Sequence, residues 1–161
     1  MQTDRLAAVH RWAGDAEQWL IAFLEAVASN RSIVAAVVMG SAVRERGHRR
    51  SDFDLLVIYR GKRPSLKAPM EVDIRFVPIE QVDEQLSNGH EILCWALKFG
   101  TALHDPELFW DRLERVWSDR IPLPSATDAR TRAELAFKRA NEMLQIRDDS
   151  AADDLLLAAV T

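Results

Sequence analysis

Two short apolar runs in the first half of the chain set the tightest limit on its fold. Ile33–Met39 is continuous, largely β-branched and followed by Gly40, and Phe53–Tyr59 is apolar on both faces once Asp54 is set aside. A strand that is apolar on both faces has to be covered on both sides, because either bare face would leave apolar surface in water. The sequence therefore predicts a sheet whose central strands are buried between other elements.

A third strand is expected at residues 70–77, where apolar and polar residues alternate. The apolar face runs from Met70 to Phe76, and the polar face carries Glu71, Asp73 and Arg75. A short extended edge is expected at 101–104. Helical spacing of apolar residues, with Gly, Asn and Pro between the segments, predicts helices at 4–29, 41–47, 79–87, 91–99, 106–118 and 125–147, and a last apolar run lies at 155–160.

The chain is expected to form one domain over residues 1–120 and a C-terminal helical segment over 121–161. Pro122 and Pro124 make a hinge-like connector between them. The chain ends in the apolar run at 155–160, which is too short to bury its own apolar face. The C-terminal segment is therefore expected to be truncated or to be an interaction surface, with a second copy of the chain or a helical protein as the partner.

The composition of the chain limits its expected cellular location and binding partners. No apolar run approaches the ~20 residues of a membrane span, and the single cysteine, Cys94, excludes an internal disulfide and a zinc spacing. These features predict a cytoplasmic protein without a membrane partner. The net charge of −4 argues against a nucleic-acid partner. Residues 44–67 nevertheless hold eight basic and three acidic residues, a local field that favours a phosphate-bearing ligand with its metal or simply marks solvated loops.

Carboxylates at the start of the second strand carry the clearest chemical signal. Asp52 and Asp54 are two residues apart, so on a strand their side chains share a face with Cα atoms roughly 6.5–7 Å apart. Such a pair repels and loses hydration, and divalent cations remove both penalties. Two metal ions about 3.5–4 Å apart can be bridged in this way. Asp73 in the next strand is the natural third ligand, although Asp-x-Asp alone is often only a turn with an acidic residue.

The order of these motifs resembles that of the nucleotidyltransferase superfamily, the polymerase beta-like group that includes the minimal (MNT) type and the aminoglycoside nucleotidyltransferases. The matching residues are Met39-Gly40-Ser41, then Ser51-Asp52-Phe53-Asp54-Leu55-Leu56-Val57, then Val72-Asp73-Ile74. The resemblance covers residues 33–77. It implies an α/β (α+β) nucleotidyltransferase fold, in which a small mixed sheet with flanking helices is followed by C-terminal helices.

The resemblance also implies a role for each matching acid. Asp52, Asp54 and Asp73 would be the catalytic residues and the metal ligands, with two Mg²⁺ ions expected. Asp52 and Asp54 would hold the ions, and Asp73 would act with them on the acceptor hydroxyl.

Four further residues would bind the nucleoside triphosphate. Gly40 lets the backbone approach the phosphates, and Ser41 offers its hydroxyl and the N–H groups of a helix start. Arg44 lies one helical turn further on and is either a phosphate partner or a solvated arginine. Ser51 would orient the carboxylates or contact phosphate.

The implied reaction is a magnesium-dependent transfer of a nucleoside monophosphate, AMP from ATP in the expected case, to an acceptor hydroxyl on a small molecule or a protein. Positioning and charge neutralisation carry most of such catalysis, so no His or Cys nucleophile is required. The alternative is an MNT-type antitoxin or binding module that acts on a helical HEPN-type partner, with or without catalysis. A Walker A loop and a nucleophile elbow are both missing from the sequence. The acceptor stays open.

Overall fold

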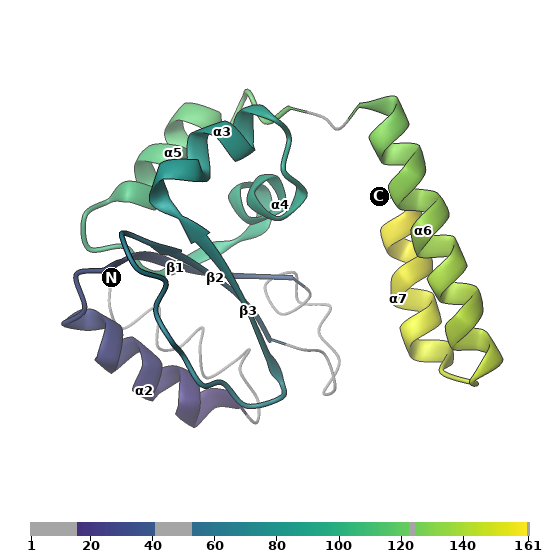
Figure 1. Cartoon of the computed structure of the whole chain (residues 1–161), viewed down its shortest axis with the longest axis horizontal. Helices are drawn as coiled ribbons and strands as arrows, with labels where there is room; N and C mark the ends of the chain where they lie inside the picture. Colours follow the sequence, from purple (N-terminus) through teal and green to yellow (C-terminus); the bar gives the residue numbers. More distant parts are fainter. Residues whose placement is uncertain (1–15, 41–52, 123–124, 161) are drawn as a thin grey trace. The chain divides into compact units, whose positions relative to one another are not determined.

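The computed structural model describes residues 16–40, 53–122 and 125–160. The chain divides into two compact units, residues 1–122 and 123–161. The first holds a sheet with helices, and the second is a pair of helices (Figure 1). The helix expected at 41–47, and most of the first half of the one expected at 4–29, lie outside the described residues.

Four strands form one mixed sheet in the first unit. They are β1 (Ile33–Met39), β2 (Phe53–Tyr59), β3 (Val72–Pro78) and β4 (Thr101–His104), in the order β3-β2-β1-β4. Strand β1 is antiparallel to both β2 and β4, whereas β2 and β3 are parallel. All seven residues of β1 are buried. The expectation of a small mixed sheet with buried central strands is confirmed.

Helices cover both faces of this sheet, as the apolar runs require (Figure 1). Helix α2 (Glu17–Ala28) covers one face, where Leu20, Phe23 and Val27 pack in one core with Leu55 and Val57 of β2. The opposite face carries the short turn η2 (Ile79–Gln81) and helices α3 (Val82–Ser87), α4 (Glu91–Phe99) and α5 (Phe109–Trp117). Their buried residues form a second core with the other face of β2.

Helix α5 begins later than its sequence predicts. The expected start was residue 106, but the helix starts at Phe109. Asp105, only 7% exposed, accepts hydrogen bonds from the backbone N–H groups of Phe109 (2.7 Å), Trp110 (3.2 Å) and Asp111 (3.1 Å). Leu108 takes a left-handed conformation with φ of 54°. The buried carboxylate therefore caps the helix and fixes its first turn.

The β3 strand also starts two residues later than predicted. Met70 lies in the turn before it and is 94% exposed, so it does not belong to the apolar face on which the alternation placed it. The backbone N–H of Phe53 donates to the carbonyl oxygen of Glu71 at 2.7 Å. This bond joins the turn to the start of β2.

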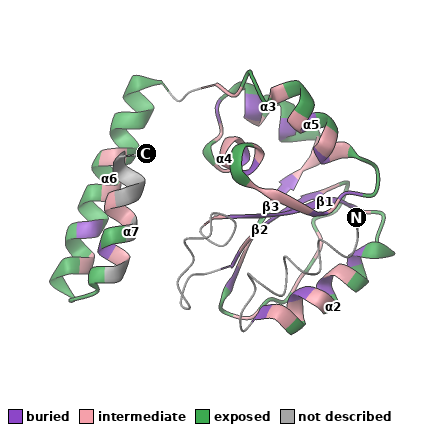
Figure 2. Ribbon diagram, turned by 180° about the vertical axis from the view of Figure 1, so that it is seen from behind, coloured by how far each residue is buried: buried purple, intermediate pink, exposed green. Residues whose placement is uncertain are grey.

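The second unit consists of α6 (Ala126–Gln145) and α7 (Asp149–Val160), which pack against each other. The backbone N–H of Asp128 donates to Ser125 Oγ at 3.1 Å, the cap that the sequence predicts. Figure 2 shows α6 largely exposed. None of the described helices is both long and apolar enough to cross a membrane.

Candidate active site

The carboxylates meet at one end of the sheet, where β1 ends and β2 and β3 begin. The register pairs Met39 with Asp54 across the antiparallel β1–β2 ladder, and Asp54 with Asp73 across the parallel β2–β3 ladder. Residues in register on neighbouring strands lie side by side on one face, with strands about 4.8 Å apart. The fold therefore makes neighbours of two acids that are 19 positions apart in the sequence.

The face that carries these acids follows from the strand period of two. Leu56 and Ile58 follow Asp54 on the same side of β2, and both pack in the core formed with α3, α4 and α5. Val77, four residues after Asp73, belongs to that core as well. Asp54 and Asp73 therefore lie on the α3–α5 face, level with Met39, the last core residue of β1.

Gly40 lies directly against Asp54. Its φ is +79°, and a Cβ built on it would fall 2.1 Å from Asp54 Oδ2 and 3.0 Å from Asp54 Cγ. No side chain can occupy that volume, and L-residues other than glycine rarely adopt this backbone conformation. The absence of a side chain at Gly40 thus gives the Asp54 carboxylate its place at the end of β1.

Asp73 has a close cationic neighbour that the sequence reasoning did not assign to the site. Arg75 Nη2 donates to Asp73 Oδ2 at 2.5 Å, and the two side chains are 53% and 41% exposed. Both residues lie on the polar face of β3, two positions apart. That spacing was the available signal, because i and i+2 on a strand share a face.

Three of the seven predicted site residues are described, and the structure brings them together: Gly40, Asp54 and Asp73. The other four, Ser41, Arg44, Ser51 and Asp52, lie outside the described residues.

A divalent cation fits the two described carboxylates. Asp54 and Asp73 offer adjacent oxygen donors, the ligand type that Mg²⁺ prefers. The Asp54 carboxylate lies against the backbone of Gly40 and fills the space that a Cβ there would take. Within the described ranges no three His, Cys, Asp or Glu side chains gather into a metal-binding group. The third predicted ligand, Asp52, is not in those ranges.

A family model of the nucleotidyltransferase domain matches residues 20–118, well over half of the chain. The chain belongs to the nucleotidyltransferase domain family. The matched residues run from α2 to the end of α5 and include Gly40, Asp54 and Asp73. No curated protein sequence matches the chain significantly. The family fixes nucleotidyl transfer as the general chemistry of this domain, and nucleoside triphosphates as its donors.

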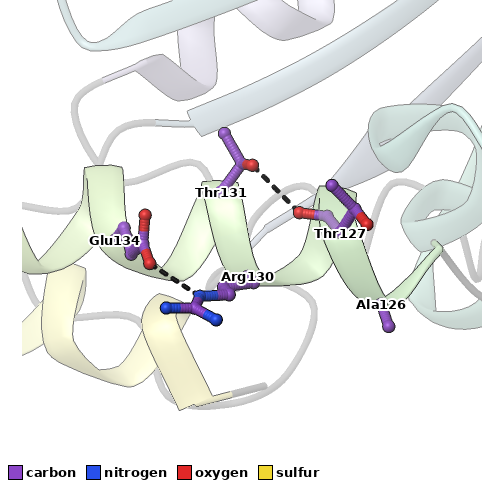
Figure 3. A pocket seen from close by; sticks show the side chains of 5 residues that line it. All are labelled: Ala126, Thr127, Arg130, Thr131 and Glu134. Atoms are coloured by element: carbon purple, nitrogen blue, oxygen red, sulfur yellow. Dashed lines mark hydrogen bonds and ion pairs between the residues drawn. The ribbon is translucent and has the colours of Figure 1, made fainter.

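Helix α6 carries a shallow hollow, formed by residues far from these acids in the sequence (Figure 3). It is lined by Ala126, Thr127, Arg130, Thr131 and Glu134. Arg130 Nε donates to Glu134 Oε1 at 2.8 Å, and Thr131 Oγ1 donates to the carbonyl oxygen of Thr127 at 2.9 Å (Figure 3). These polar groups bind one another along the helix, so the hollow offers no convergent set of groups for chemistry.

Proposed function

We propose that this nucleotidyltransferase domain transfers AMP from ATP, with two Mg²⁺ ions, to an acceptor hydroxyl on a small molecule or a protein. The observation that supports it most is the register of Asp54 with Asp73 beside the side-chain-free surface of Gly40. Membership of the family supports the general reaction. In this proposal the enzyme is cytoplasmic, in keeping with its single cysteine, Cys94.

In this proposal Asp52, Asp54 and Asp73 hold the metal ions. Bound Mg²⁺ supplies charge neutralisation at the phosphates and at the attacking oxygen. The bond from the α-phosphorus to the oxygen that bridges it to the β-phosphorus would break while the acceptor oxygen bonds to that phosphorus. Pyrophosphate would leave, and the proton of the acceptor hydroxyl would pass to the Asp73 carboxylate. Asp73 acts together with Asp52 and Asp54 on the acceptor hydroxyl.

The phosphates of the donor are bound by the turn after β1. Gly40 lets the backbone approach them, and Ser41 adds a hydroxyl donor in the proposal. Arg44 contributes a guanidinium, and Ser51 orients the neighbouring acids. Because such sites work by positioning and electrostatics, the loss of one carboxylate is expected to cost far more in rate than in stability.

The test is label transfer from each of the four α-³²P nucleoside triphosphates, with Mg²⁺, to candidate acceptors and to the protein itself. We expect transfer with pyrophosphate release and a preference for ATP. Asp54→Asn and Asp73→Asn are each expected to lower the rate about 100-fold or more. Asp111→Asn is the matched control, because it removes a surface carboxylate that is paired with Arg115. The absence of both nucleotide binding and transfer with every donor would refute the proposal.

A binding module that acts by contact is the second candidate. It is favoured by the exposed apolar side chains on and after α6, namely Leu135, Phe137, Leu144 and Ile146. Phe137 and Leu144 share a face of α6, whereas Leu135 lies on the opposite face. The face of Phe137 and Leu144 fits a helical partner or a second copy of the chain. Asp54→Asn separates the two candidates, because a contact module keeps its full biological activity in that variant whereas an enzyme loses it.

A further inference from the structure

Among the ion pairs of the described residues, one involves a proposed metal ligand. In this pair Arg75 contacts Asp73, and both lie on β3. Its Nη2 lies 2.5 Å from Asp73 Oδ2. Across the β2–β3 ladder Arg75 is in register with Leu56, which is buried and apolar. Strand β2 therefore places an apolar residue beside Arg75. On this face Arg75 contacts Asp73, two residues before it on its own strand.

The guanidinium occupies one of the two Asp73 carboxylate oxygens that a metal ion could use. Mg²⁺ binds carboxylate oxygens at about 2.0–2.1 Å. An ion at that distance from Asp73 Oδ2 would lie within a few ångströms of Arg75 Nη2, and two cations so close repel strongly. Asp73 Oδ2 therefore either binds the metal ion or keeps its ion pair with Arg75. These two states of Asp73 compete.

The ion pair also affects the stability of the site when no metal ion is bound. Asp54 and Asp73 are in register on adjacent strands, so two carboxylates face the same space. Like charges in register on a sheet are destabilising. The positive charge of Arg75 offsets part of that repulsion at Asp73.

We propose that Arg75 is a positioning residue that holds the Asp73 carboxylate in a resting state and competes with the divalent cation for it. This inference rests on the proposed function, because it takes Asp73 as a metal ligand. Asp73 then changes from guanidinium to metal when the ion, alone or with its nucleotide, reaches the site. Arg75 in this way sets the metal concentration at which the site becomes active.

The experiment is a titration of the whole protein with Mn²⁺, with free Mn²⁺ read by electron paramagnetic resonance. Arg75→Gln is expected to bind Mn²⁺ about three- to fivefold more tightly than the unchanged protein, the scale of an exposed ion pair. Arg75→Lys keeps the charge without the guanidinium fork and is expected to lie between the two.

Arg60→Gln is the matched control. Arg60 follows β2 directly, pairs with Glu107 at 3.2 Å and is 48% exposed, so the same charge is lost from a similar ion pair. It lies six residues along from Asp54, about 20 Å on a strand and beyond the screening length in 0.15 M salt. Its Mn²⁺ affinity is expected to equal that of the unchanged protein.

A second measurement uses thermal unfolding. Without divalent ions Arg75→Gln is expected to have the lower Tm, because Asp73 loses its ion-pair partner. Saturating Mg²⁺ should raise its Tm by more than it raises that of the unchanged protein, because the ligand binds the variant more tightly. A purely structural role for Arg75 would lower Tm without this larger response to Mg²⁺.

The outcomes separate the inference from the function on which it rests. If Asp54→Asn abolishes Mn²⁺ binding but Arg75→Gln binds as the unchanged protein does, or more weakly, the inference is wrong and the proposed metal site stands. If the unchanged protein and Asp54→Asn both fail to bind Mn²⁺, both are wrong. Should Arg75→Gln not fold, Arg75→Lys decides, and an affinity no higher than that of the unchanged protein overturns the inference.

Discussion

Two glycines of the first unit have nearly the same left-handed backbone but very different surroundings. Gly40 has φ of +79° and leaves no room for a Cβ beside Asp54, whereas Gly61 has φ of +75° and nothing within 4 Å of a built Cβ. An alanine in this conformation costs about 1–2 kcal/mol at either position. Only at Gly40 does the added methyl group also displace a carboxylate.

The pair gives a residue-scale prediction. Gly40→Ala and Gly61→Ala are both expected to lower the free energy of unfolding, by about 1–2 kcal/mol for the backbone strain alone. Only Gly40→Ala is expected to lose Mn²⁺ binding and most nucleotidyl transfer, because Asp54 Oδ2 must move. Chemical denaturation and Mn²⁺ titration of both variants check this. Equal losses of activity in the two variants would mean that the contact with Asp54 is irrelevant.

At the scale of elements, the strands and most helices could be predicted because each has a recognisable local periodicity of apolar residues in the sequence. The start of α5 could not, because it depends on the three hydrogen bonds that Asp105 accepts once it is buried. The ion pair of Arg75 with Asp73 was visible as strand spacing, but nothing in the sequence says that the guanidinium turns to that acid. Gly40 was assigned to phosphates from its motif, whereas its contact with Asp54 needs the β1–β2 register.

Helix α5 carries a second prediction, on pH. Burial raises the pKa of Glu114, while the hydrogen bond from Trp110 Nε1 at 2.7 Å acts in the opposite direction and lowers it. A raised pKa in the folded state means that the protonated acid favours folding. This contribution is complete below the unfolded pKa near 4.5 and is lost as pH rises through the folded value.

Glu114→Gln removes that titration and keeps an acceptor for Trp110. The variant is therefore expected to gain stability relative to the unchanged protein at pH 7, and to gain less or nothing at pH 4. Thermal melts of both proteins at the two pH values measure the difference. A Tm difference that is the same at pH 4 and pH 7 would contradict the burial cause.

At the scale of the whole molecule, the two units differ in how much they bury. The sheet unit has two cores with residues at or near zero exposure, while α6 and α7 contribute only Ala140 and Ala152 to the buried apolar residues of the described chain. The described residues of this pair therefore bury less apolar surface than those of the sheet unit. The apolar side chains that α6 leaves exposed therefore favour a further contact.

The last prediction concerns self-association through the exposed apolar side chains of α6. A second copy of the chain is the partner that any pure sample contains. Phe137 and Leu144 are seven residues apart on α6 and so share a face of the helix. We expect sedimentation equilibrium to show self-association that increases with protein concentration, and Phe137→Ser to weaken it. Lys138→Ser is the matched control, since it puts the same residue at the next, exposed position. A chain that stays monomeric at all concentrations, with Phe137→Ser indistinguishable from it, would leave this face to a different partner.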